Sequence, residues 1–210
     1  MATLSITVKA AGTLASAKTD ALILLLPDRK TLPAELKALD AVLSGTLGRA
    51  LKQGDFSGTV GASHSLPGAG AIKRVLLIGC GSPDKMTVAQ AKKTSETMAR
   101  ALMATPATDA LIAMNALSGK VAAPETLIEQ LSLQATLAHY QYSHTLNKRK
   151  KPKRALKRVV ISPDESCSAS RARRAVRLGS ATGQGANLTR ELVNLPGNIC
   201  TPKYLASEAR

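Results

Sequence analysis

Hydrophobic positions along the chain fall into alternating and uninterrupted segments, and both predict β-strands. Apolar and polar residues alternate in Leu4–Val8, as in a strand with one buried face. Ala21–Leu26 is uninterrupted and is followed by proline, which is typical of a strand covered on both faces. Later strands are predicted at Val75–Ile78, Asp109–Met114 and Lys157–Ile161.

Apolar residues three and four positions apart predict amphipathic helices between these strands. The first helix is expected from about Thr31 to Gln53, with an apolar stripe at Leu36, Leu39, Leu43, Leu47 and Leu51. The second runs from Thr87 to about Met103 and begins with a capping box between Thr87 and Gln90.

Two further helices complete the pattern. One opens at Pro124 and is expected to end near Leu146. The other covers Ala169–Glu191 and is weakened by Gly179, Gly183 and Gly185. Strands that alternate with helices of this length predict a three-layer α/β fold, with a mostly parallel or mixed sheet flanked by helices.

Composition narrows the class of protein. The 210 residues are 44% hydrophobic and 20% charged, which is typical of a folded, soluble chain. The aromatic residues, one Phe and three Tyr, are too few for a surface on which nucleic-acid bases stack. RNA-recognition and oligonucleotide-binding folds of that kind are therefore disfavoured.

The compartment is predicted from the N-terminus and the cysteines. Residues 1–9 reach a lysine before an apolar core can form, so they do not resemble a signal peptide, and Ala21–Pro27 is too short to span a bilayer. Cys80, Cys167 and Cys200 are odd in number and far apart, which favours a reducing environment. We expect a cytoplasmic protein that does not enter a membrane.

One glycine-rich turn is a candidate phosphate-binding site. Ile78–Gly81 ends a predicted buried strand, where a dinucleotide-binding turn would lie. The third small residue of that fingerprint is replaced by Asp84, which follows Pro83 and would repel phosphate. An ordinary tight turn is the favoured interpretation.

The remaining ionisable residues do not suggest an active site. His139 and His144 are expected on one helix but five positions apart, so they point to different sides and make a poor metal pair. The acidic residues are scattered, at Asp20, Asp28, Glu125, Glu129, Asp164 and Glu165. We therefore assign no catalytic and no metal-binding residue to this chain.

Positive charge is concentrated in the last third of the chain. The formal net charge is +15, and most of it lies after residue 146. Such density can neutralise phosphates and give sequence-independent, salt-sensitive affinity for DNA or RNA, although a solvated loop is the plainer interpretation. The candidate nucleic-acid-binding residues are Lys148, Arg149, Lys150, Lys151, Lys153, Arg154, Lys157, Arg158, Arg171, Arg173, Arg174 and Arg177.

The segment Leu188–Ala206 resembles the leucyl aminopeptidase (cytosol aminopeptidase) family. Its sequence, Leu-Thr-Arg-Glu-Leu-Val-Asn-Leu-Pro-Gly-Asn-Ile-Cys-Thr-Pro-Lys-Tyr-Leu-Ala, is similar to the run that joins the two domains of that family. It departs from the family at Glu191, commonly Asp, and at Gly197, commonly Pro. Weaker resemblances occur at Asp20–Ile23, Lys73–Gly81 and Tyr140–Lys150.

The resemblance implies a fold, an activity and a division into domains. It implies a macro-domain-like N-terminal domain at 1–165, a connector helix at 166–195 and the start of a C-terminal peptidase domain at 196–210. Family members are hexamers that release N-terminal residues, often leucine, from peptides. Their two metal ions, manganese or zinc, are held by Val-Gly-Lys-Gly and Asn-Thr-Asp-Ala-Glu-Gly-Arg motifs, neither of which occurs here.

We therefore expect the N-terminal, non-catalytic part of a leucyl aminopeptidase. Its partner would be its own catalytic domain, and alone it would bind no metal and cleave no peptide. A helix start at Thr201-Pro202 without a later stop signal leads us to expect a longer natural chain. DNA binding through residues 148–177 is the alternative, and a macro-like fold leaves open an ADP-ribose-like ligand.

Overall fold

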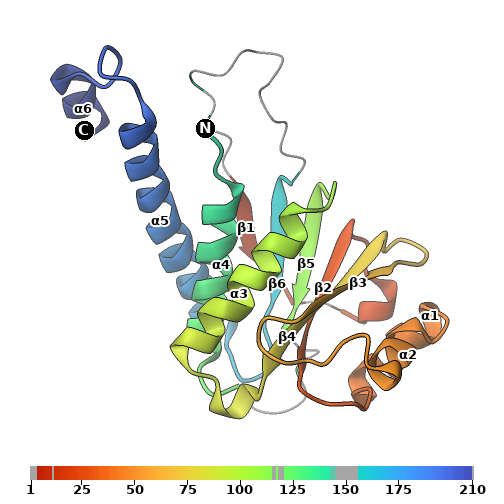
Figure 1. Ribbon diagram of the computed structural model, residues 1–210. Coiled ribbons are helices and arrows are strands. Elements are labelled where there is room, and N and C mark those ends of the chain that lie inside the picture. Colours follow the sequence, from red (N-terminus) through yellow and green to blue (C-terminus); the bar gives the residue numbers. More distant parts are fainter. Residues whose placement is uncertain are drawn as a thin grey trace.

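The computed structural model describes residues 4–10, 12–114, 117, 121–142, 144 and 156–209. Its centre is a six-stranded sheet in the order β1-β6-β5-β2-β4-β3 (Figure 1). All neighbouring strands are parallel except β3 and β4, which are antiparallel. The strands are β1 (Ser5–Val8), β2 (Ala21–Pro27), β3 (Ser63–Pro67), β4 (Arg74–Gly81), β5 (Asp109–Ala113) and β6 (Arg158–Ser162).

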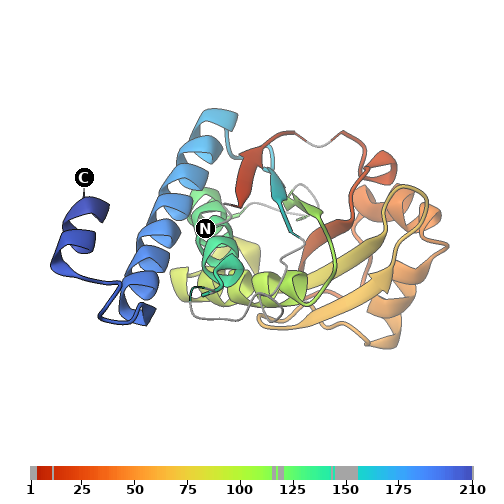
Figure 2. The same ribbon diagram turned by 90° about the horizontal axis from the view of Figure 1, so that it is seen from above.

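Helices cover both faces of the sheet, which confirms the predicted mixed α/β fold of three layers (Figure 2). The helices are α1 (Lys37–Val42), α2 (Thr46–Gln53), α3 (Val88–Met103), α4 (Pro124–His139), α5 (Ala169–Asn194) and α6 (Pro202–Glu208). Residues of α3, α4 and α5 contribute to one hydrophobic core, and residues of α1 and α2 contribute to the other.

Strand β2 lies in the middle of the sheet, and every one of its residues is buried. Successive side chains of a strand point to opposite faces. Ile23 and Leu25 therefore join the core beneath α3 and α4, whereas Leu24 and Leu26 join the core beneath α1 and α2. The uninterrupted hydrophobic run thus supplies both cores from one strand.

Two predicted helices have different limits in the structure. The single helix expected over Thr31–Gln53 is wrong: a short 3-10 turn, Ala34–Leu36, precedes α1, and α2 starts anew after a break. Ser44 and Gly45 have φ values of 55° and 73°, which a right-handed helix cannot contain. The leucine spacing continues across this break because both short helices pack on the same core.

Helix α4 ends at His139, and the predicted end near Leu146 is therefore wrong. Tyr140 adopts an extended conformation with ψ of 136°, so the chain leaves the helix there without a glycine or proline to mark the stop. The capping box of α3 is confirmed: the amide of Gln90 donates to Thr87 Oγ1, and the amide of Thr87 donates to Gln90 Oε1.

Helix α5 packs against α4 along most of its length, and its end projects beyond the sheet, with α6 on its far side (Figures 1 and 2). A Cβ atom at Gly179 would lie 2.2 Å from the backbone oxygen of Glu129, so this glycine permits close contact between the two helices. No helix among the described residues combines the length and apolar character that crossing a bilayer requires.

Candidate functional site

The glycine-rich segment at the end of β4 is occupied by neighbouring backbone. A Cβ atom at Gly79 would lie 1.9 Å from the carbonyl oxygen of Thr59. The amide groups of Gly79 and Gly81 donate to the carbonyl oxygens of Ala62 and Gly58, so they are not free to bind a phosphate. The structure therefore agrees with an ordinary strand end at this position.

The three histidines lie in different surroundings. His64 is half-buried in β3, and His139 is buried with its Nε2 atom 3.0 Å from the carbonyl oxygen of Leu156. His144 lies beyond the end of α4, so the expectation that it shares a helix with His139 is wrong. Among the described residues, no three His, Cys, Asp or Glu side chains gather where they could hold a metal ion.

Several acidic side chains have structural partners. The carboxylate of Asp109 accepts from Thr19 Oγ1 at 2.7 Å and pairs with Arg158 at 3.2 Å. Glu125 of α4 forms an ion pair with Arg171 of α5. These carboxylates fix strands and helices to one another.

Sequence reasoning missed a polar cluster around Glu191. This residue of α5 is only 4% exposed. Its Oε2 atom accepts a 2.7 Å hydrogen bond from the Tyr140 hydroxyl, and its Oε1 atom lies 2.9 Å from Nε2 of His144. Burial, followed by the bond to Glu191, raises the pKa of Tyr140 above its ordinary value. The cluster joins residues 51 positions apart, so no local pattern could predict it.

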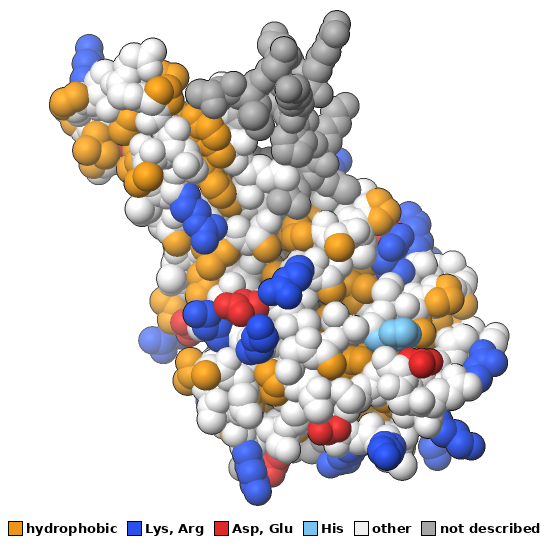
Figure 3. Space-filling view, in the orientation of Figure 1, with side chains coloured by type: hydrophobic (Ala, Val, Ile, Leu, Met, Phe, Trp, Pro, Cys, Tyr) orange, Lys and Arg blue, Asp and Glu red, His pale blue; other side chains and the backbone are white. Residues whose placement is uncertain are grey.

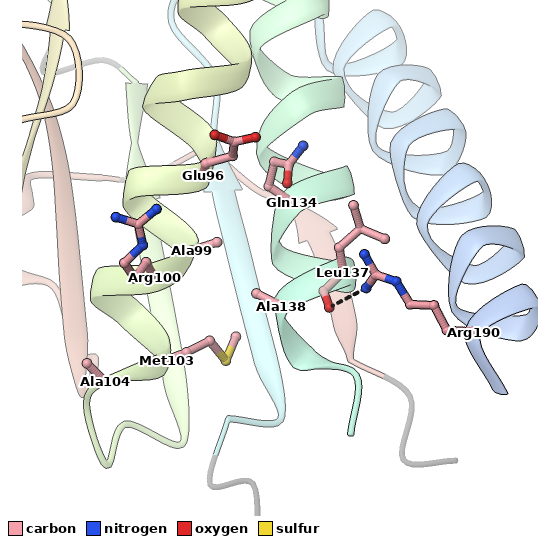
Figure 4. A pocket seen from close by; sticks show the side chains of 9 residues that line it. All are labelled: Glu96, Ala99, Arg100, Met103, Ala104, Gln134, Leu137, Ala138 and Arg190. Carbon is pink, nitrogen blue, oxygen red and sulfur yellow. Dashed lines mark hydrogen bonds between the residues drawn. The ribbon is translucent and has the colours of Figure 1, made fainter. Parts of the chain in front are cut away.

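A shallow groove of about 540 Å³ lies between α3 and α4, with Arg190 of α5 at its side (Figure 4). Its lining residues are Glu96, Ala99, Arg100, Met103, Ala104, Gln134, Leu137, Ala138 and Arg190. Nη1 of Arg190 donates to the carbonyl oxygen of Leu137 at 3.4 Å. The lining offers apolar contact and two guanidinium groups, but it has no Ser, Cys or His that could act as a nucleophile or a base.

The candidate nucleic-acid residues fall into three groups. Arg173, Arg174 and Arg177 are exposed on α5, whereas Arg171 and Arg158 are engaged in the ion pairs described above. Lys157 is exposed just before β6. The remaining cations, Lys148, Arg149, Lys150, Lys151, Lys153 and Arg154, lie outside the described residues. On the face in Figure 3, Lys and Arg side chains are scattered among other residues and do not form one continuous patch.

Comparison with known proteins gives a consistent result. The model of the cytosol aminopeptidase family, N-terminal domain, matches residues 22–149. A probable cytosol aminopeptidase of Nitrosococcus oceani is 36% identical over 205 residues, which cover 95% of this chain and 40% of that protein. One from Cupriavidus taiwanensis is 37% identical over 210 residues, with 92% and 40% covered. The chain thus spans about 40% of the length of these relatives.

Solved structures match the same fold. A mutant of tomato leucine aminopeptidase superposes with a TM-score of 0.75 at 23% identity, over 98% of this chain and 41% of that one. The bottromycin maturation enzyme BotP, in complex with Mn, gives a TM-score of 0.62 at 21% identity, over 90% of this chain and 35% of that one. At these identities the match concerns the fold.

Proposed function

Because this chain belongs to the cytosol aminopeptidase family, and its matched part is the N-terminal domain of that family, we propose that it serves a metal-dependent leucyl aminopeptidase as its non-catalytic domain. The complete protein would release N-terminal residues, often leucine, from peptides in the cytoplasm. The observation that carries this proposal is the match of nearly the whole chain to only about 40% of each relative.

The two metal ions of such an enzyme do not fit the residues described here. The carboxylates of Asp20, Asp109 and Glu125 are paired with basic side chains, and the described histidines lie apart from one another. Manganese or zinc would be held by groups outside this chain, in the Lys and Asp motifs of a catalytic domain. The role of the present residues would be assembly, including a hexamer, and control of access to that domain.

The domain limits that we propose follow the helices. Residues 1–165 would form the macro-like body, 166–195 the connector, and 196–210 the start of the peptidase domain. The connector would consist mainly of α5, which begins at Ala169 against α4 and ends at Asn194 beyond the sheet. Helix α6 begins at Pro202, has no buried residue, and lies apart from the body (Figure 2).

The gene sequence downstream of the Arg210 codon tests this proposal. We expect the reading frame to continue into Val-Gly-Lys-Gly and Asn-Thr-Asp-Ala-Glu-Gly-Arg motifs. A stop codon directly after Arg210, with no peptidase domain encoded nearby, would contradict the proposal.

Binding of duplex DNA is a second candidate function. It is supported by Arg173, Arg174 and Arg177, which are exposed on one helix and have no carboxylate partner within the described part of the chain. Phosphate contacts made by such residues weaken as salt is added, because bound counterions are released on association. Titration of duplex DNA at two salt concentrations tests this candidate, and an affinity that does not change with salt would argue against it.

A further inference from the structure

The two halves of α5 are held in different ways. Before Gly183, its buried residues are mostly apolar or small, and they pack against α4 and the sheet. Beyond Gly183, the buried residues within the helix are Asn187 and Glu191, both polar. Val193 is 78% exposed. Leu195 is buried just past the helix and Leu188 and Leu192 are half-buried, so the fully buried contacts of the projecting end within the helix are hydrogen bonds.

These hydrogen bonds reach the end of α4. The last four carbonyl groups of a helix lack partners within the helix. Asn187 Nδ2 donates to the carbonyl oxygen of Thr136 at 2.9 Å, and Arg190 donates to that of Leu137. A cation at the carboxyl end of a helix also interacts favourably with the helix dipole. Side chains of α5 thus donate hydrogen bonds to carbonyl groups at the carboxyl end of α4.

Glu191 lies one turn after Asn187 on α5 and adds further contacts with the end of α4. Each of its carboxylate oxygens has one partner, Tyr140 or His144, and both partners come from the segment that follows α4. Asn194 Nδ2 lies 3.3 Å from the same Tyr140 hydroxyl. Burying a carboxylate without such partners has a high cost in free energy. The hydrogen bonds therefore favour the observed position of the segment after α4 against α5.

We propose that Asn187, Arg190, Glu191 and Asn194, together with Tyr140 and His144, form a latch that sets the direction of the projecting end of α5. The pivot lies at Gly185: a Cβ atom at Gly183 would still lie 2.8 Å from Thr136 of α4, whereas one at Gly185 would contact nothing within 4 Å. Glycine weakens a helix interior, so the helix bends most easily there. When the latch opens, residues 186–209 turn relative to the body while the two cores stay intact.

The latch is a property of this chain, although its use as a guide for a second domain rests on the proposed function. Its test is therefore made on the chain alone. One spin label is attached to Cys200 and another to an introduced Lys52→Cys on α2, with the buried Cys80 and Cys167 replaced by Ala. Pulsed electron paramagnetic resonance then measures the distribution of distances between the two labels, one on the projecting end and one on the body.

We expect a single narrow distribution for the parent and a broadened one for Tyr140→Phe, which removes only the hydroxyl. Thr189→Ala is the matched control, because Thr189 lies on the same helix but bonds only to the carbonyl oxygen of Gly185. Its distribution should stay narrow. A narrow distribution for Tyr140→Phe would overturn the latch without affecting the family assignment.

Hydrogen exchange gives a second readout that does not need labels. Amides of residues 187–194 should exchange about fivefold faster in Tyr140→Phe, while those of α3 keep their parent rates. Glu191→Gln should act on the same amides, and the double variant should change them by less than the sum of the two. Equal acceleration in α3 would mean general destabilisation and would refute the proposal; if Glu191→Gln does not fold, Tyr140→Phe still decides.

Discussion

Lys73 and Asp20 form an ion pair, with Nζ 2.5 Å from Oδ1, at the amino-terminal ends of β4 and β2. The other carboxylate oxygen of Asp20 accepts from the backbone amide of Thr108, at 2.8 Å, and from its hydroxyl. Thr108 directly precedes β5. One carboxylate therefore fastens the same ends of three neighbouring strands.

This arrangement predicts how stability depends on pH. The bond to Lys73, followed by the bonds to Thr108, holds the pKa of Asp20 well below its ordinary value of 3.8. A carboxyl whose pKa is lower in the folded state stabilises fully above its unfolded pKa, and the stabilisation is lost as pH falls below that value. The free energy of unfolding should therefore fall as the pH drops from about 5 to 3.

Urea unfolding at several pH values measures this effect. Asp20→Asn should be less stable than the parent at pH 7 and should lose less on acidification. Asp28→Asn, which changes an exposed aspartate at the other end of β2, should follow the parent curve. Parallel curves for Asp20→Asn and the parent would show that this carboxylate does not contribute as described.

Two glycines of α5 should respond oppositely to alanine. A methyl group at Gly179 would collide with the backbone oxygen of Glu129, so Gly179→Ala should destabilise the protein by about 1–3 kcal/mol. Gly185 has open space, so Gly185→Ala should stabilise it by about 0.5–1 kcal/mol through helix propensity. Thermal or urea unfolding checks both, and changes of the same sign would contradict the packing of α5 on α4.

The three cysteines should differ in reactivity. Cys80 and Cys167 are buried, whereas Cys200 is partly exposed. Burial raises the pKa of the Cys80 thiol to about 12, so little reactive thiolate forms near neutral pH. Mass spectrometry after brief iodoacetamide treatment at pH 7.5 should find the label on Cys200 first. Rapid labelling of Cys80 in the folded protein would indicate that the end of β4 opens.

The DNA-binding candidate makes a quantitative prediction about salt. Changing Arg173, Arg174 and Arg177 to Gln together should reduce the slope of log affinity against log salt by about 2–3, if each contacts a phosphate. The control changes Lys30, Lys37 and Lys52 to Gln, which removes the same charge from exposed positions elsewhere. Equal effects of the two triple variants would mean that only net charge matters.

Five of the six strands and the fold class could be predicted, because buried strands leave a local hydrophobic pattern. Strand β3 was not predicted, because Leu66 is its one buried residue. The hydrophobic run of β2 and the capping box of Thr87 and Gln90 are local signals, and the structure confirms the strand and the helix start that they predict. The break at Ser44–Gly45 was missed because the leucine spacing runs across it. The end of α4 was missed because Tyr140 carries no stop signal.

The latch between α5 and the end of α4 could not be predicted, because the residues that it joins are distant in sequence. Asn187 and Thr136 are 51 positions apart, as are Tyr140 and Glu191. A buried Glu among helical residues looks like an ordinary surface residue until the packing of α5 on α4 is known. The family resemblance located this segment, but it did not indicate which side chains meet there.

Under the proposed function, this chain supports an aminopeptidase without containing its hydrolytic site. The most direct measurement is the release of p-nitroaniline from leucine p-nitroanilide by the purified chain with added manganese or zinc. At every protein concentration, we predict that p-nitroaniline is released no faster than in the metal-containing buffer without protein. Release that rises in proportion to the chain, and elutes with it on size-exclusion chromatography, would contradict the account.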